Sequence, residues 1–186
     1  EAYYRTNDFK SAISFFELCV ADEKDRNSFL YFFLGHCYYK SLDFENAISN
    51  FEYVLDAPDS IMQYSYYFLG ISYIQIGNFN YALQAFKQSS KYNFNKKLKE
   101  EAYFNFAKLA YQLDLPIENT LQTLNNYLKN FDNPTNIQHI NLLVAQILQS
   151  SSQYEEAYNV LSVVSNPTFD QQKSMQRLAF FLGVKE

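Results

Sequence analysis

Tryptophan is absent from this 186-residue sequence, and cysteine, glycine and proline are scarce, with two, four and four residues. Cys19 and Cys37 are too few for a disulfide framework and form no Cys-x-x-Cys pair, so we expect buried free thiols. No apolar run approaches the roughly 20 residues that a membrane-spanning helix needs. The sequence is therefore not typical of disulfide-rich domains or of membrane-spanning segments.

Basic residues are also in deficit, since 15 Lys and Arg stand against 20 Asp and Glu and give a formal net charge of −5. A protein that holds a phosphate backbone needs a basic face, so we expect no nucleic-acid partner. The apolar bulk is supplied by 17 Tyr and 18 Phe within a chain that is 48% hydrophobic. This composition indicates a folded protein whose core and amphipathic surface are built largely from single-ring aromatics.

The N-terminus starts without Met and without a signal-peptide pattern, inside what reads as the end of a helix. We therefore expect the chain to be a piece of a longer protein. Its compartment stays open between a bacterial periplasm or cell envelope and the cytoplasm.

The sequence repeats itself. FFLGHCYYKSLDFENAISNF, residues 32–51, aligns without a gap on YFLGISYIQIGNFNYALQAF, residues 67–86, and Ala12, Ala47 and Ala82 lie 35 residues apart. A fixed period of this length indicates one supersecondary unit repeated, each copy being unable to bury its apolar face alone. The aromatic residues with the same spacing are Phe9, Phe16, Phe44, Phe51, Phe79 and Phe86.

Within each unit the apolar residues recur at helical spacing in two stripes separated by a short break. The break is KSLD in one copy and QIGN in the next, where Gly77 and Asn78 suit a helix end. Two antiparallel helices per unit follow. Gly35 and Gly70 interrupt the first helix of each unit at about 1 kcal/mol against Ala, so we expect close approach of the second helix there.

This order of residues resembles the tetratricopeptide repeat (TPR). The resemblance implies an all-α fold, a right-handed α-α superhelix of about five helix-turn-helix repeats. It is strongest in two copies, Tyr31, Leu34, Gly35, Tyr38, Phe44, Ala47 and Phe51, and then Tyr66, Leu69, Gly70, Tyr73, Phe79, Ala82 and Phe86.

Weaker copies extend the resemblance over nearly the whole chain, with Ala110 and Thr120 departing from the pattern and Ala145, Tyr154, Ala157 and Leu161 restoring it. We expect a single array with units at 1–24 (partial), 25–58, 59–94, 95–132, 133–166 and 167–186 (partial or capping). The later units are similar to long bacterial cell-envelope TPR proteins, and the abundance of Asn, Lys, Tyr, Phe and Ile is typical of an AT-rich genome such as those of the Bacteroidetes.

No catalytic pattern stands out, and we expect neither enzymatic activity nor a cofactor. Three of the four glycines are used by the repeat, and no Gly-x-Ser-x-Gly or His-Glu-x-x-His stretch occurs. His36 and His139 lack a ligand-spaced partner, so a groove or surface histidine is favoured over a zinc ligand. The lysines from Lys91 to Lys99 are followed by two glutamates, which favours a solvated turn between repeats over a nucleic-acid patch. The acidic pair Glu155 and Glu156 is expected in the first turn of a helix.

The resemblance implies a non-enzymatic scaffold whose first helices line a groove for a partner. Carried over position by position, the partner-binding residues are Phe32, His36 and Tyr39, then Tyr67, Ile71 and Ile74, then Phe104, Lys108 and Tyr111, and finally Leu142, Gln146 and Gln149. This surface is apolar and aromatic in three units and polar in the last. The expected partner is a protein or peptide segment with apolar side chains. Members of the family that clamp a C-terminal carboxylate carry Lys and Asn at such positions, where this chain has Phe32 with His36 and Tyr67 with Ile71.

Three alternatives stay open at this point. The groove aromatics are either exposed for a partner or packed as ordinary core. The chain is either an adaptor or a structural spacer that self-associates within a longer solenoid. A glycan-binding or enzymatic use of the aromatic surface would need more carboxylate and amide partners beside the rings.

Overall fold

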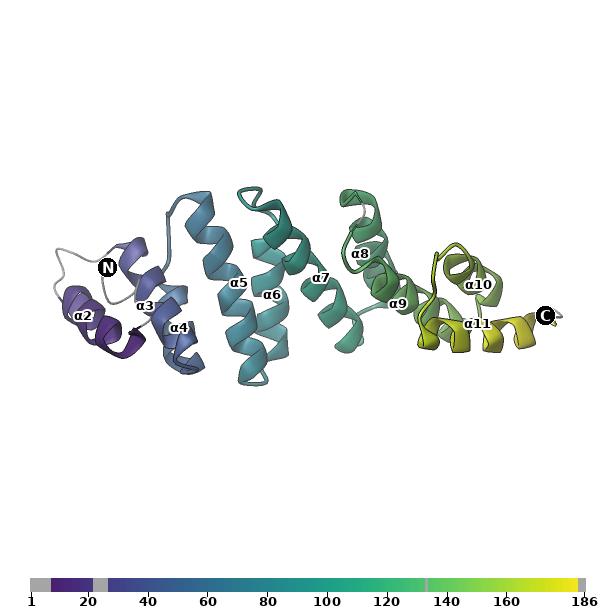
Figure 1. Cartoon of the computed structure of the whole chain (residues 1–186), viewed down its shortest axis with the longest axis horizontal. Helices are drawn as coiled ribbons and strands as arrows, with labels where there is room; N and C mark the ends of the chain where they lie inside the picture. Colours follow the sequence, from purple (N-terminus) through teal and green to yellow (C-terminus); the bar gives the residue numbers. More distant parts are fainter. Residues whose placement is uncertain (1–7, 22–26, 133, 184–186) are drawn as a thin grey trace. The chain divides into compact units, whose positions relative to one another are not determined.

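The computed structural model describes residues 8–21, 27–132 and 134–183, and in these ranges it contains ten helices and no strand (Figure 1). The fold is all-α, as the periodicity predicts. In each predicted repeat we call the first helix A and the second helix B. The A helices are α3 (Ser28–Lys40), α5 (Asp59–Gln75), α7 (Lys96–Gln112), α9 (Ile137–Ser150) and α11 (Phe169–Leu182). The B helices are α2 (Phe9–Ala21), α4 (Phe44–Glu52), α6 (Phe79–Ser89), α8 (Ile117–Asn130) and α10 (Tyr154–Ser162).

The chain divides into two compact units, Glu1–Leu109 and Ala110–Glu186, with the boundary near the end of α7. In unit 1, α3 packs on α2, α4 and α5, and α5 packs on α6. In unit 2, α9 packs on α8 and α10, and α10 packs on α11. Whether all ten helices form one continuous array stays a prediction.

Each A helix but the last ends in the same tight turn, and in each turn one residue has a positive φ. These residues are Leu42 at 62°, Gly77 at 76°, Asp114 at 49° and Ser152 at 60°. The residue that follows donates its backbone N–H to a carbonyl five residues back, as Asn78 N does to Tyr73 O at 2.8 Å. This is the bond pattern of a Schellman C-cap, which favours glycine at the left-handed position. The predicted break at QIGN is therefore confirmed.

The loops that connect one repeat to the next are held by side chains near the start of an A helix. The Ser28 hydroxyl accepts the backbone N–H of Leu55 at 3.1 Å. At the equivalent position of the next repeat, the fully buried Gln63 donates from Nε2 to the carbonyls of Tyr92 and Asn95 and accepts the Asn95 N–H at 2.8 Å. These hydrogen bonds give backbone groups of the loops partners within the protein.

Lys91 lies in this loop, as predicted for a turn between repeats, whereas Lys96, Lys97 and Lys99 lie in the start of α7, where the prediction of a turn is wrong. Lys91 and Lys99 donate to the side-chain oxygens of Gln88 and Asn93 at 2.8 and 2.7 Å. Glu155 and Glu156 lie in the first turn of α10, also as predicted.

The junction between successive repeats in unit 1 uses a recurring hydrogen bond. Tyr38 donates to the Glu17 carboxylate, and at the equivalent positions Tyr73 donates to the Glu52 carboxylate. The next copy has Lys87 in place of the glutamate, and its Nζ lies 5.8 Å from the centre of the Phe106 ring. The third junction therefore substitutes a cation–π contact for the tyrosine–carboxylate bond.

The core lies between neighbouring A and B helices, and it includes the contacts of a B helix with the A helix that follows it. In unit 1 one cluster joins Ala12, Phe16, Leu34 and Cys37, and in unit 2 another joins Ala145, Ala157, Leu161 and Leu178. Burial raises the pKa of the Cys37 thiol to about 11. Cys19 is only half-buried, so the expectation of two buried thiols is wrong for that residue, which lies near the end of a B helix.

Candidate functional site

The predicted partner-binding residues lie on three successive A helices, one helical turn apart on each. We call the set in unit 1 the A-helix surface: Phe32, His36 and Tyr39 on α3, Tyr67, Ile71 and Ile74 on α5, and Phe104 and Lys108 on α7. Phe32 is 8% exposed and packs against the rings of Phe33 and Phe51, whereas all the other members are half-buried. Phe32 therefore packs beneath the A-helix surface, and the solvent-exposed parts of the other seven side chains form that surface.

Phe68 joins the α3 and α5 parts of the A-helix surface. Its ring centre lies 4.9 Å from those of His36 and Tyr39, and 6.0 Å from that of Phe51, on which it stacks. Phe68 is not among the partner-binding residues predicted from the sequence, although Phe33, its equivalent one repeat earlier, stacks in the same way on Phe16 at 6.1 Å. The 35-residue spacing between Phe33 and Phe68 is the sequence feature that could have identified Phe68.

Tyr67 joins the α5 and α7 parts. Its hydroxyl donates to Glu101 Oε2 at 3.1 Å, and its ring meets that of Phe86 edge-on at 5.9 Å. Burial, together with the neighbouring Glu101 carboxylate, raises the pKa of the Tyr67 hydroxyl, which stays protonated as a donor. Tyr67 is thus both part of the surface and part of its framework, because it holds two A helices together.

His36 is the polar group at the α3 end of the surface. Its ring lies edge-on against Phe68 and 6.2 Å from the Tyr39 ring. Burial lowers the pKa of His36 to about 4, and the positive charge of Lys40 acts in the same direction. The imidazole is therefore neutral at pH 7 and can take part in hydrogen bonds without adding charge to an apolar surface.

The remaining predicted residues lie in unit 2, with Tyr111 on α7 and Leu142, Gln146 and Gln149 on α9. The Tyr111 hydroxyl donates to Gln146 Oε1 at 3.3 Å, and both residues line an open cavity of about 360 Å³. The other walls come from the end of α7, the start of α8 and α9, including Leu115, Ile117 and Ile147. Two positions predicted from different repeats, 111 and 146, are thus brought together.

The aromatic residues of the A-helix surface are partly packed as core and partly exposed, so each of the two alternatives holds in part. The rings of His36, Tyr39 and Tyr67 pack against the following A helix or the B helix of their own repeat, yet all three keep part of their surface in solvent. Repeat-to-repeat packing and an accessible apolar strip therefore involve the same side chains.

In residues 8–21, 27–132 and 134–183, no three His, Cys, Asp or Glu side chains converge in a way that could hold a metal ion. None of the helices in those ranges has both the length and the apolar character needed to cross a membrane.

Known proteins resemble this chain in structure but not detectably in sequence. No family model and no curated protein matches the sequence. Among solved structures, YrrB, described as a TPR protein with an unusual peptide-binding site, superimposes with a TM-score of 0.67 at 15% identity and covers 98% of this chain and 87% of its own. The MamA protein gives 0.64 at 18% identity, covering 84% and 83% of the two chains.

A third similar structure is the C-terminal part of a TPR repeat-containing protein from Cytophaga hutchinsonii. It has a TM-score of 0.57 at 14% identity and covers 86% of this chain and 60% of the other. Together with the helix pairs and their repeated turns, these likenesses show the fold: the chain is an α-α solenoid of the tetratricopeptide-repeat type.

Proposed function

We propose that the chain is a non-enzymatic scaffold that binds an apolar segment of a partner protein on the A-helix surface of unit 1. The observation that carries the proposal is a strip of half-buried aromatic and aliphatic side chains that continues across three A helices. The likeness to YrrB, a protein described as having a peptide-binding site, supports the proposal by analogy of fold.

The contacts within the strip suit it to this role. Phe68 fixes the rings of His36 and Tyr39, and the bond to Glu101 fixes Tyr67, so these side chains lose little freedom when a ligand arrives. Ile71 and Ile74 lie beyond Tyr67 along α5, one and two helical turns away, and add aliphatic area. Each 100 Å² of apolar surface removed from water contributes about 2.5 kcal/mol before the cost of ordering the ligand.

The experiment is a selection of peptides from a displayed random 12-residue library on the intact chain, followed by affinity measurements with variants. Ile71→Gln, Ile74→Gln removes aliphatic surface while keeping residues that favour a helix. Tyr81→Gln is the matched control, since Tyr81 is a large exposed residue on the B helix α6.

We expect the selected peptides to share large apolar side chains, and we expect the double α5 variant to weaken their binding at least tenfold while Tyr81→Gln leaves it unchanged. Equal weakening by both variants, or none by either, would place the binding surface elsewhere. Circular dichroism of each variant checks that helicity is retained.

A further inference from the structure

Unit 2 contains an open cavity of about 590 Å³ whose lining differs in charge from the chain as a whole. It is formed by Gln149 of α9 and by Lys173, Gln176, Arg177, Phe180 and Phe181 of α11. Every charged group in this lining is a cation, although the whole chain has a net charge of −5. The site therefore has a local charge opposite to that of the protein.

The two cations lie four residues apart on one face of α11, as its fifth and ninth residues. The fifth and ninth residues of α3 are Phe32 and His36, which belong to the A-helix surface. Where α3 has an aromatic ring and a neutral imidazole, α11 therefore has two positive side chains.

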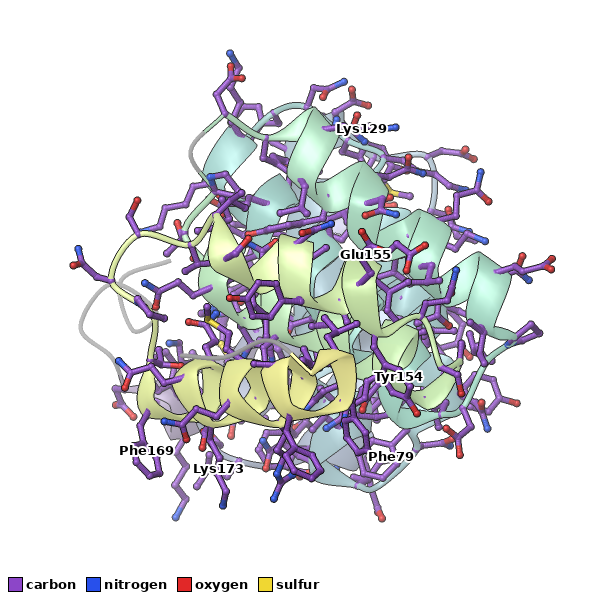
Figure 2. All side chains as sticks on the ribbon, turned by 90° about the vertical axis from the view of Figure 1, so that its right-hand side faces the viewer. Phe79, Lys129, Tyr154, Glu155, Phe169 and Lys173 are labelled. Atoms are coloured by element: carbon purple, nitrogen blue, oxygen red, sulfur yellow. The ribbon has the colours of Figure 1, made fainter. Side chains whose placement is uncertain are left out.

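Neither cation is neutralised by the part of the chain that the structure describes, because Lys173 and Arg177 form no ion pair with a carboxylate there. Figure 2 shows the Lys173 side chain directed away from α10, on the side opposite to Glu155. Two like charges one helical turn apart without a counter-ion destabilise a helix slightly, so the stability of α11 does not explain why both cations are present. Binding of an anionic group of a ligand would explain them.

The other lining residues suit a ligand that carries both apolar and acidic groups. Phe180 is 82% exposed, and Phe181 is fixed from one side by stacking on Tyr154 at 4.9 Å and 12°. Gln149 and Gln176 add amide donors beside the cations. The Arg177 guanidinium can bind a carboxylate through two parallel hydrogen bonds.

We infer that this cavity binds an acidic stretch of the partner segment, in which Asp or Glu side chains alternate with apolar ones. The inference rests on the proposed function, because it gives the partner proposed for the A-helix surface of unit 1 a separate, charged contact in unit 2. A peptide suits the site better than nucleic acid, since only two cations are present and the surrounding chain is acidic.

The test is fluorescence anisotropy on the intact chain with two labelled 12-residue peptides, each with blocked termini so that no terminal carboxylate is read. One repeats Glu-Leu-Asp-Phe three times, and the other repeats Gln-Leu-Asn-Phe. We expect the acidic peptide to bind at least tenfold more tightly, with a preference that falls as salt is added. In the Lys173→Gln, Arg177→Gln variant, the ratio of the affinities for the acidic and the amide peptide should fall to about one.

Lys96→Gln, Lys97→Gln is the matched control, because it makes the same change in net charge at two exposed positions of α7. It should leave the preference unchanged. The inference is overturned if the acidic peptide does not bind, if the two peptides bind equally, or if the α11 variant keeps the preference. Tighter binding of a 12-nucleotide single strand to Lys173 and Arg177 would also overturn it, in favour of a phosphate site.

The Ile71→Gln, Ile74→Gln variant separates this inference from the proposed function. If that variant loses affinity for both peptides while the α11 variant changes nothing, the apolar surface is supported and the acidic site is refuted. If only the α11 variant alters binding, the acidic site stands and the surface on α5 is refuted.

Discussion

Gly70 of α5 lies directly against the ring of Phe86 on α6, so that a Cβ placed on Gly70 would fall 2.9 Å from Phe86 Cε1 and Cζ. The equivalent pair in the preceding repeat is Gly35 and Phe51, with a distance of 3.0 Å to Cδ1 and Cε1. Both rings are buried, with Phe86 wholly enclosed and Phe51 2% exposed. The glycine in each A helix therefore makes room for the aromatic ring of its own B helix, and the cost of glycine in a helix is offset by burial of that ring.

The Gly70→Ala substitution should destabilise the chain by about 1–3 kcal/mol, because the Phe86 ring has to shift in a close-packed core. This loss exceeds the gain of up to about 1 kcal/mol that alanine brings to a helix interior. Urea unfolding followed by circular dichroism measures the difference. If Gly70→Ala is more stable than the original chain, the ring is not confined as the structure places it.

The left-handed turn position gives a prediction of opposite sign. Leu42 has a φ of 62° and is 74% exposed, whereas the next repeat has Gly77 there at 76°. A left-handed conformation costs a residue with a side chain roughly 1–2 kcal/mol, so Leu42→Gly should stabilise the chain by about 1 kcal/mol. Gly77→Leu should cost a similar amount. Thermal unfolding of the two variants tests both signs, and an unchanged midpoint in either would contradict the account of the turn.

Ser65 of α5 has a buried hydroxyl without a hydrogen-bond partner among the described residues, which predicts that Ser65→Ala stabilises the chain by about 1 kcal/mol or more. Ser72 on the same helix is the control, since its equally buried hydroxyl donates to the Phe68 carbonyl at 2.8 Å. Both changes bring the same gain in helix propensity, so the difference between them isolates the unpartnered hydroxyl. Denaturant titrations should rank Ser65→Ala above Ser72→Ala, and the reverse order would be inconsistent with the structure.

His36 predicts a dependence of stability on pH. Its pKa of about 4 lies below the usual value of 6.5, so the unfolded chain binds a proton first as the pH falls. The stability contributed by neutral His36 is present above about pH 6.5 and is lost progressively down to about pH 4. For this half-buried side chain we expect a loss of about 1–2 kcal/mol.

His36→Ile places at this position the residue that Ile71 supplies in the next repeat. The difference in unfolding free energy between pH 7 and pH 4.5 should be smaller in this variant than in the original chain by about the amount lost through His36. Parallel pH profiles for the two proteins would show that His36 titrates normally in the folded state.

Much of the fold could be predicted because local rules determine it. The spacing of Ala47 and Ala82 gave the repeat, the helical stripes gave two helices per repeat, and Gly77 gave the turn. Gly35 and Gly70 correctly indicated a close approach of the second helix, because glycine in a helix needs such a reason.

The candidate site was less predictable because it depends on contacts between repeats. Family positions selected Phe32, which is buried, and passed over Phe68, which holds α3 and α5 together. Whether a ring on an A helix is exposed depends on the neighbouring helix, and no pattern within a single helix reports this. Lys173 and Arg177 were missed for a similar reason, since their meaning emerges only when Gln149 and Phe180 form the other walls.

The most direct measurement of the central claim is site-specific photo-crosslinking in cells of the source organism, with a benzophenone amino acid in place of Ile74 on the A-helix surface. The same amino acid in place of Tyr81 on α6 serves as the reference position. The account predicts a crosslink from position 74 to a partner protein through an apolar segment, and no such product from position 81. Crosslinks from position 81 alone, or from position 74 only to a second copy of this chain, would contradict the role of the A-helix surface as a scaffold for a partner.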